Sequence, residues 1–364
     1  MIVGCSKELK NHEYRVGITP DNVKEYVSRG HVVLVEKNAG VGAGFNDEDY
    51  MKAGARIVET ANEIYKTSDM IIKVKEPEPC EYELLKEGQI LFTYLHLAPN
   101  KELTKVLLDK KITGIAYETI VDKNGFLPCL IPMSQIAGKL AIHEGAKYLQ
   151  QSFGGRGILL GGVPGVEKGT VVIIGGGTVG LNAAKVATGL GANVIIVDRS
   201  LHRLAMLDDI FGASISTLYL NEANIENALR KADLVVCSVL VPGGSTPKLI
   251  KREHLKMMKP GAVIVDVSID QGGCCETSRV TKHDDPIYVE DGIVHYCVGN
   301  MPGAVPHTST IALTNATLKY GLLIADNGVD FLDNLNPSIR AGVNTFNGEC
   351  VNENVANAYY SQNE

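Results

Sequence analysis

Residues 170–198 constrain the fold of this chain more than any other stretch. A β-branched run at residues 171–174 leads into the glycine turn GGGTVG at residues 175–180. A helical pattern follows, and a second apolar run ends at Asp198. A glycine turn between a strand and a helix, with an acid at the tip of the next strand, is typical of a dinucleotide-binding βαβ unit. The stretch therefore predicts a Rossmann-like parallel sheet.

The glycines of the turn have separate expected roles. Gly175 permits the tight turn, Gly177 lets the backbone approach a pyrophosphate, and Gly180 lets the helix pack closely on the strand. The N-terminus of the helix then faces the phosphate charge. A glycine turn in an ordinary α/β unit is the alternative interpretation, and the strand, helix and acid around this turn favour nucleotide binding.

The acid that ends the second strand indicates which dinucleotide is bound. The Asp198 carboxylate would accept hydrogen bonds from both adenosine ribose hydroxyls and would repel a 2′-phosphate, which favours NAD over NADP. Two arginines that follow it, Arg199 and Arg203, leave NADP open as an alternative.

Composition limits the class of protein. A length of 364 residues, with 45% hydrophobic and 21% charged residues, fits a soluble globular protein of two domains. The net charge of −7 comes without acidic runs or a basic stripe, so we expect no nucleic-acid partner and no membrane partner. The N-terminus does not read as a signal peptide and no apolar run could span a bilayer, which predicts a cytoplasmic location. None of the 8 cysteines has CxxC or zinc-ligand spacing, so no metal site is predicted.

Apolar runs and helical patterns alternate along the chain, which predicts an α/β fold. We expect two Rossmann-like doubly wound domains with mainly parallel sheets. Two long helical patterns are expected to link them: residues 134–153, with Ser134 as the N-cap, and residues 307–324.

The glycine fingerprint assigns the domains. Residues 131–306 are expected to form the NAD-binding domain, because they contain it. Residues 1–130 and 307–364 are expected to form a discontinuous substrate domain, with the C-terminal tail packed back on the first half. A glycine-dense segment at residues 154–169 suggests a domain boundary.

Several polar residues follow predicted strands, where ligands collect in doubly wound sheets. They are Arg15, Lys75, His96 and Asp270. Strand alternation would place Lys73 and Lys75 on one face of a strand that ends before Pro77, with Lys75 nearest its tip.

Together these residues fit dehydrogenase chemistry. Arg15 and Lys75 could hold a substrate carboxylate, Arg15 through its bidentate fork. His96 offers an imidazole that titrates near neutral pH, and Asp270 could orient a proton or an attacking water. The ordinary alternatives are a surface arginine, a snorkelling lysine, a satisfied histidine and a turn-capping acid. Signatures of serine hydrolases, P-loop enzymes and zinc proteases are absent from the sequence.

Motifs along the whole chain resemble those of the alanine dehydrogenase family, which includes the NAD-binding subunit of proton-translocating transhydrogenase. The matching segments are ELKNHEYRVGITP (residues 8–20), KVKEPEP (73–79), Tyr94-Leu95-His96, MSQIAG (133–138), the glycine turn, VDVSID (265–270), NMPGAVP (300–306) and RAGVNTFNGECVNENVA (340–356).

The resemblance implies reversible oxidative deamination of L-alanine to pyruvate and ammonium with NAD, in a homo-oligomer that is usually a hexamer. It implies that Arg15 and Lys75 bind the substrate and that His96 and Asp270 handle protons. Leu220 stands where the family tends to place a small polar residue near the adenine. With the fingerprint, the expected cofactor contacts are Ser134, Gly175, Gly177, Thr178, Val179, Gly180, Asp198, Arg203, Val239, Leu240, Val267, Ser268, Ile269, Asp270, Arg279, Val298, Gly299, Asn300 and Met301.

Two other functions stay open on the sequence. One is a related NAD-dependent dehydrogenase that acts on a larger amino acid, or an opine- or saccharopine-type enzyme that joins two substrates. The other is a non-catalytic, transhydrogenase-like NAD-binding subunit. The presence of both His96 and Asp270, which a pure binding module would not need, favours an enzyme.

Overall fold

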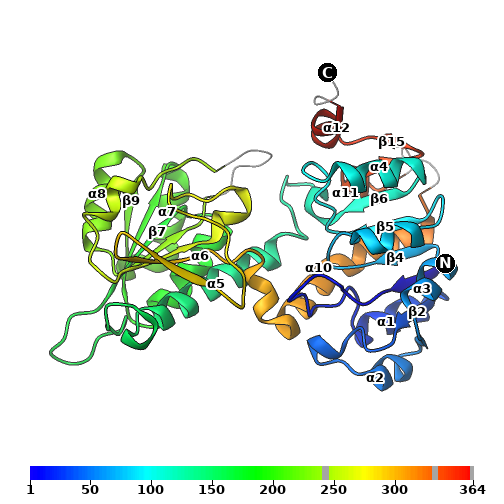
Figure 1. Cartoon of the computed structure of the whole chain (residues 1–364), viewed down its shortest axis with the longest axis horizontal. Helices are drawn as coiled ribbons and strands as arrows, with labels where there is room; N and C mark the ends of the chain where they lie inside the picture. The colour runs from blue at the N-terminus through cyan, green and yellow to red at the C-terminus, as the bar shows by residue number, and fades with distance from the viewer. Residues whose placement is uncertain (240–245, 330–334, 361–364) are drawn as a thin grey trace. The chain divides into compact units, whose positions relative to one another are not determined.

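A computed structural model describes residues 1–239, 246–329 and 335–360 (Figure 1). The chain divides into two compact units, Met1–Met133 with Val305–Glu364, and Ser134–Ala304. The glycine-dense segment at residues 154–169 lies inside the second unit, so its prediction as a domain boundary is wrong. Among the described residues, no helix combines the length and the apolar character needed to cross a membrane.

The first unit is built on an eight-stranded sheet in the order β15-β14-β6-β5-β4-β1-β2-β3. Neighbouring strands from β6 to β3 pair in parallel, and β14 and β15 add an antiparallel edge. The C-terminal tail therefore packs on the first half, as predicted, and it does so as part of the sheet. The strands are β1 (Ile2–Cys5), β2 (Val32–Glu36), β3 (Arg56–Val58), β4 (Met70–Ile72), β5 (Ile90–Thr93), β6 (Thr113–Ala116), β14 (Val343–Phe346) and β15 (Glu349–Cys350).

Several helices of the first unit begin directly after a residue whose side chain caps them. Asn100 caps α4 by accepting a hydrogen bond from the amide of Leu103. The long helix α10 ends before Gly328. The helices are α1 (Pro20–Ser28), α2 (Asp47–Lys52), α3 (Ala61–Thr67), α4 (Lys101–Asp109), α10 (Pro306–Asn327), α11 (Pro337–Gly342) and α12 (Glu353–Tyr360), with short 3-10 turns η1 (Val41–Ala43), η2 (Pro79–Leu84) and η3 (Tyr117–Thr119).

The second unit contains a seven-stranded sheet in the order β12-β13-β11-β10-β7-β8-β9. Every neighbouring pair is parallel except β12 with β13. Two mostly parallel sheets with helices confirm the predicted α/β fold class. The strands are β7 (Thr170–Ile174), β8 (Asn193–Asp198), β9 (Ile215–Tyr219), β10 (Leu234–Cys237), β11 (Val263–Asp266), β12 (Ile287–Glu290) and β13 (Ile293–Tyr296).

The helix that enters the second unit starts earlier than its sequence pattern indicated. It begins at Ile131 and ends at Tyr148, so Ser134 lies in its first turn and is not its N-cap. The helices are α5 (Ile131–Tyr148), α6 (Thr178–Gly189), α7 (Leu201–Phe211), α8 (Glu222–Lys231) and α9 (Arg252–Leu255), with 3-10 turns η4 (Gln151–Phe153), η5 (Gly212–Ser214), η6 (Val267–Gln271) and η7 (Met301–Ala304).

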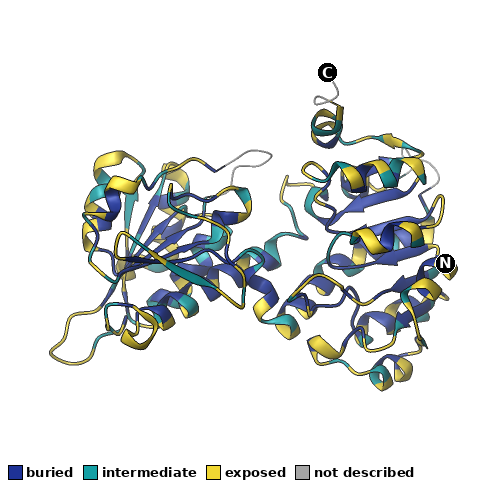
Figure 2. Ribbon diagram, in the orientation of Figure 1, coloured by how far each residue is buried: buried dark blue, intermediate teal, exposed yellow. Residues whose placement is uncertain are grey.

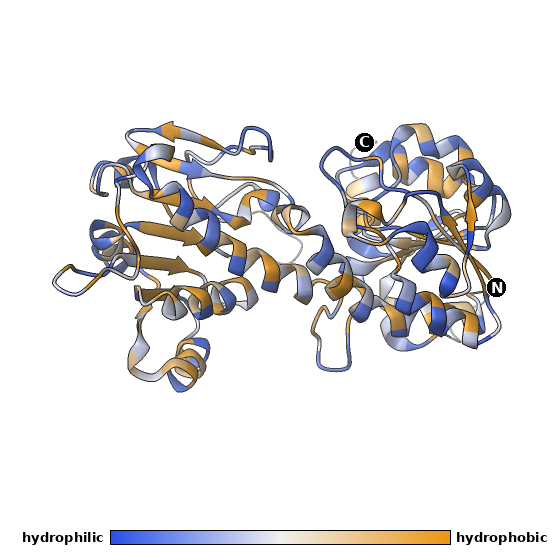
Figure 3. Ribbon diagram, turned by 90° about the horizontal axis from the view of Figure 1, so that it is seen from below, coloured by the Kyte–Doolittle hydropathy of each residue, from blue (hydrophilic) through white to orange (hydrophobic). Residues whose placement is uncertain are grey.

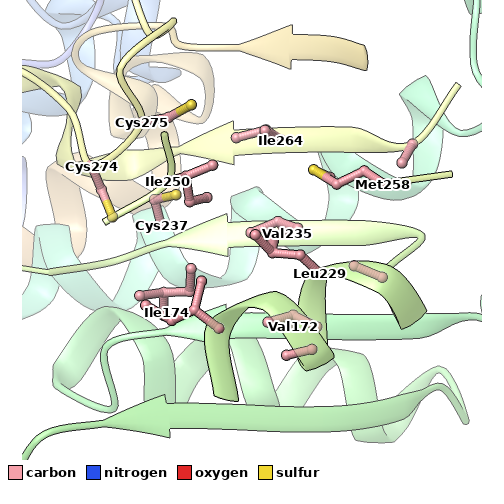
Figure 4. Close-up of a cluster of buried hydrophobic side chains, with 14 of the residues drawn as sticks. Val172, Ile174, Leu229, Val235, Cys237, Ile250, Met258, Ile264, Cys274 and Cys275 are labelled. Carbon is pink, nitrogen blue, oxygen red and sulfur yellow. The ribbon is translucent and has the colours of Figure 1, made fainter. Parts of the chain in front are cut away.

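The central strands are buried and apolar, as expected for parallel sheets covered on both faces. Figure 2 shows these strands in dark blue with exposed outer faces on the helices, and Figure 3 shows their apolar character in orange. One core cluster of the second unit packs β-branched strand residues against Leu229, Met258 and the thiols of Cys237, Cys274 and Cys275 (Figure 4). These thiols are free and buried, which makes them part of the packing.

Candidate functional site

The glycine turn of the second unit has the geometry that excludes side chains. Gly175 has a φ of 101°, and a Cβ there would lie 2.8 Å from the carbonyl oxygen of Ser238. A Cβ on Gly180 would lie 2.0 Å from the carbonyl oxygen of Gly175. A Cβ on Gly177 would meet nothing within 4 Å, so this side of the turn is open. The N-cap of α6 is Gly177, which makes no side-chain cap hydrogen bond, so the first amides of the helix can bind an anion.

Asp198 and Arg203 both bind the backbone of the glycine turn. One oxygen of Asp198 accepts a hydrogen bond from the amide of Gly176 at 2.6 Å, and the other accepts one from the amide of Ser200 at 2.8 Å. The Arg203 guanidinium donates to the carbonyl oxygens of Gly176 and Gly177. A carboxylate has about four acceptor positions, so Asp198 keeps capacity for the two ribose hydroxyls.

Two serines at the ends of neighbouring strands stabilise the same region. The Ser238 hydroxyl donates to the carbonyl oxygens of Ile174 and Gly175, at 3.0 and 2.7 Å. The Ser268 hydroxyl donates to the carbonyl oxygen of Val239 at 2.9 Å. Sequence reasoning missed Ser238, whose only signal was its place directly after β10. Leu240, an expected cofactor contact, lies outside the described residues.

The segments after β11 and β13 bring more of the expected residues together. Asp270 is exposed on η6, and a Cβ on Gly299 would lie 3.2 Å from its Oδ1. Asn300 has a φ of 60°, an uncommon conformation for a residue other than glycine. Such backbone is often found at functional sites.

The remaining candidates of this unit have a range of environments. The Arg279 guanidinium stacks 3.9 Å above the centre of the Tyr288 ring. The others lie on the elements already described: Ser134 on α5, Thr178 and Val179 in the first turn of α6, Val267 and Ile269 on η6, Val298 after β13, and Met301 on η7.

In the first unit, Arg15 is a buried residue and not a solvated surface charge. It is 2% exposed, and its guanidinium donates to both oxygens of Glu13, at 2.7 and 2.5 Å. Burial alone would lower the pKa of Arg15, but the Glu13 carboxylate outweighs it, so the pKa is raised and the charge is kept. Nη1 of Arg15 also lies 3.1 Å from the sulfur of Met133. Glu13 was not among the predicted residues.

Lys73 and Lys75 do not share a strand face, so that prediction is wrong. Strand β4 ends at Ile72, before either lysine, and the amide of Val74 between them donates to the Glu8 carboxylate at 2.6 Å. The Lys73 ammonium is fully buried, 3.0 Å from a carboxylate oxygen of Glu81 and 3.5 Å from one of Glu8.

Lys75, unlike Lys73, has no carboxylate of the described residues in contact with its ammonium. Its ammonium makes no ion pair or hydrogen bond within the described parts of the chain. Burial lowers the pKa of Lys75, and the positive charge of Arg15 lowers it further. The two predicted substrate-binding cations therefore lie close enough to influence each other.

His96 lies beside a carboxylate that the sequence analysis did not single out. Its Nδ1 is 3.5 Å from Oε2 of Glu76, and Lys10 binds the other oxygen of Glu76 at 2.6 Å. Burial would raise the pKa of Glu76, but its interactions with His96 and Lys10 hold it well below its usual range. The backbone amide of His96 donates to Glu118 at 2.7 Å, and its φ is 46°. The imidazole is half-exposed, so a substrate can reach it.

One cluster of potential metal ligands lies away from these residues. Glu222, Glu226 and His254 are close together on α8 and α9. Lys251 already binds Glu222 at 2.6 Å, and its backbone amide donates to Nδ1 of His254. The neutral imidazole therefore carries its hydrogen on Nε2 and offers no free lone pair. We assign no metal to this cluster.

Both units match the family whose motifs they carry. Residues 4–137 match the model of the alanine dehydrogenase/PNT N-terminal domain, and residues 141–353 match that of the C-terminal domain. The alanine dehydrogenase of Methanococcus maripaludis is 56% identical over 360 residues, covering 99% of this chain and 96% of the relative. That of Bacillus subtilis is 53% identical over 357 residues, covering 98% and 94%.

Solved structures agree with these relatives. A solved L-alanine dehydrogenase aligns with a TM-score of 0.96 at 48% identity and covers 99% of both chains. A transhydrogenase from Sinorhizobium meliloti aligns with a TM-score of 0.84 at 24% identity over 97% of this chain and 99% of that chain, which is a likeness of fold. From the two family models and the extent of these matches, the chain belongs to the alanine dehydrogenase family.

Proposed function

We propose that this chain catalyses the reversible, NAD-dependent oxidative deamination of L-alanine to pyruvate and ammonium. The observation that carries the proposal is that full-length relatives at 56% and 53% identity are alanine dehydrogenases. The reaction balances as alanine, NAD⁺ and water giving pyruvate, ammonium, NADH and a proton. We assign cofactor binding to residues 131–306, and substrate binding to residues 1–130 with 307–364.

The residues of the second unit fit a nicotinamide dinucleotide. The uncapped N-terminus of α6 and the open side of Gly177 suit a pyrophosphate, and Asp198 suits an unphosphorylated ribose. When bound, the nicotinamide supplies the hydride acceptor for the alanine Cα. Preference for NAD over NADP follows from the negative charge of Asp198. An Asp198→Ser variant should gain activity with NADPH relative to NADH, whereas an unchanged ratio of kcat/KM values would contradict this role.

The first unit supplies cations for the substrate carboxylate. Arg15 is anchored through Glu13 and keeps its charge, and Lys75 has no carboxylate in contact in the described structure. A substrate carboxylate would provide the anion that Lys75 lacks among the described residues. It would also favour the charged form of Lys75, against the effect of burial and of Arg15.

Proton transfer is assigned to His96 and Asp270. The half-exposed imidazole of His96 can take a proton from the attacking water or return it to the departing nitrogen. Glu76 beside it would stabilise the imidazolium that forms. The exposed carboxylate of Asp270 can orient the water or the ammonium product.

NADH consumption tests the reaction directly. The purified protein should consume NADH only when pyruvate and ammonium are both present. No consumption with NADH binding intact would refute the proposal. It would favour another oxo acid or a binding subunit, and a panel of larger oxo acids separates these two.

Two substitutions test the proton assignments. His96→Ala and Asp270→Asn should each lower kcat by orders of magnitude while NADH still binds, because neither holds the pyrophosphate. Matched controls are His143→Ala and Asp209→Asn, which change exposed helical residues and should leave kcat unchanged. Near-normal turnover in either test variant would remove that residue from the mechanism.

We also propose a cytoplasmic homohexamer, on the family resemblance. Light scattering after size-exclusion chromatography should give a mass near six times 39.1 kDa. The mass of a monomer or a dimer would refute the hexamer.

A further inference from the structure

A buried carboxylate organises the segment that carries Asp270. Asp266 ends β11 and is 1% exposed. Its Oδ1 accepts a hydrogen bond from the amide of Ser268 at 3.1 Å. Its Oδ2 accepts from the amides of Cys274 and Cys275, at 2.9 and 3.2 Å, and from the Ser278 hydroxyl at 2.6 Å. Four donors, one within η6 and three after it, therefore converge on one side chain.

A lysine binds the same segment through its carbonyl groups. The Lys248 ammonium donates to the carbonyl oxygens of Gly272, Gly273 and Cys275, the last two at 3.0 and 3.2 Å. Gly273 has a φ of 81°, and a Cβ there would lie 2.8 Å from Oδ2 of Asp266. The chain thus turns tightly around the carboxylate while the lysine holds its outer side.

Backbone hydrogen bonds join this segment to residues 246–250. The amide of Thr246 donates to the carbonyl oxygen of Gln271 at 3.0 Å, and the amides of Leu249 and Ile250 donate to that of Cys274, at 2.8 and 3.1 Å. The Asp266 and Lys248 contacts therefore belong to one hydrogen-bonded platform.

Asp270 depends on this platform for its position. Its carboxylate makes no hydrogen bond or ion pair with the described residues. The backbone of η6 therefore sets where the carboxylate lies, since no hydrogen bond or ion pair of the side chain with a described residue does so.

We propose that Asp266 and Lys248 are positioning residues that fix η6 and thereby the carboxylate of Asp270. The inference rests on the proposed function, because it gives Asp270 a proton-handling role. Asp266 accepts hydrogen bonds from amide and hydroxyl groups of the segment, and Lys248 donates hydrogen bonds to its carbonyl groups. Small displacements of a reacting group lower rates strongly, so loss of either contact acts on kcat.

Asp266→Asn is the first test. The amide keeps the size of the side chain, and its oxygen can still accept from Ser268, but its NH₂ group meets the three donors now bound to Oδ2. We expect kcat for reductive amination to fall roughly tenfold to a hundredfold, with the Kd for NADH changing less than about threefold. Lys248→Met leaves the Asp266 bonds intact and should lower kcat by a smaller factor. It replaces Asp266→Asn as the test if Asp266→Asn fails to fold.

Asp233→Asn is the matched control. Asp233 is also a buried aspartate of this unit, 4% exposed, and it binds the amide of Thr170, Arg156 and Lys259. It precedes β10, which pairs in parallel with β7. Asp233 therefore lies at the edge of the sheet where these strands begin, and the glycine turn lies at the edge where they end. This variant should lose thermal stability and keep kcat.

A double-mutant cycle separates positioning from a general loss of structure. If Asp266 acts through Asp270, adding Asp266→Asn to Asp270→Asn should lower kcat by less than about twofold. The same factor in both backgrounds, or unchanged kcat in both Asp266→Asn and Lys248→Met, would overturn the inference. Full activity in Asp270→Asn alone would instead refute the proposed role of Asp270 and, with it, the target of this positioning.

Discussion

Replacing Glu8 by glutamine should change how the stability of the first unit depends on pH. Glu8 is 7% exposed, accepts the amide of Val74 and lies 3.5 Å from the Lys73 ammonium. Burial raises its pKa from 4.5 to about 7, against the opposing effect of Lys73. Glutamine keeps the shape and an acceptor for the Val74 amide, but it does not titrate.

The sign follows from the direction of the shift. A carboxyl group with a folded pKa above its unfolded pKa contributes stability that is fully present below the unfolded value and is lost as pH rises through the folded value. Here the window runs from about 4.5 to about 7. Between pH 5 and pH 8 the wild type should therefore lose roughly 2.5 kcal/mol of unfolding free energy relative to Glu8→Gln.

Hydrogen exchange of the amides in β1 and β4 measures this difference without requiring the two units to unfold together. Comparing the two proteins at the same pH cancels intrinsic exchange rates. The protection of the wild type relative to Glu8→Gln should fall roughly seventyfold between pH 5 and pH 8. Glu25→Gln, on the exposed face of α1, is the control and should show no such trend. A ratio that stays constant, or rises with pH, would refute the reasoning.

Further substitutions test the other buried contacts. Glu13→Gln should destabilise the protein by about 3 kcal/mol in urea unfolding and raise the KM for pyruvate, because it leaves the Arg15 guanidinium buried beside a neutral amide; an unchanged KM would contradict the anchoring role. Gly180→Ala should weaken NADH binding in calorimetry at least about tenfold, since its Cβ would lie 2.0 Å from a carbonyl oxygen, whereas Gly189→Ala on the same helix meets nothing within 4 Å and should bind normally. Lys75→Met should raise the thermal unfolding midpoint and abolish pyruvate binding; a lower midpoint would show that the ammonium is compensated in the fold.

The fold was readable from the sequence where the signal is local. Apolar runs, the glycine turn and capping residues such as Asn100 depend on neighbours in the chain, and they gave the α/β class and most elements. The ends of elements depend on distant partners. Strand β4 stops at Ile72, and two residues further on the amide of Val74 donates to Glu8, more than sixty positions away. Likewise, the pairing of β14 with β6 joins segments more than two hundred positions apart.

The candidate site was predicted as a set of residue types and not as a set of contacts. Arg15, Lys75, His96 and Asp270 were selected by their positions after strands. Their partners were missed, because a glutamate next to a lysine in a loop has no pattern that distinguishes a surface charge from a buried one. Glu76 shows the difficulty: its pKa and its role depend on His96 and Lys10, which come from other parts of the sequence.

Charge balance explains why two lysines two positions apart have different expected roles. Lys73 is enclosed by two carboxylates and the Ser6 hydroxyl, so its charge is compensated within the fold. Arg15 is likewise compensated by Glu13. Lys75 lacks such a contact among the described residues, and burial lowers its pKa. Even a partly buried cation such as Lys75 costs stability unless a ligand supplies the opposite charge. The folded chain therefore keeps at Lys75 an electrostatic deficit that a small carboxylate such as pyruvate would remove, and this deficit, more than the number of cations, favours an anionic substrate in the first unit.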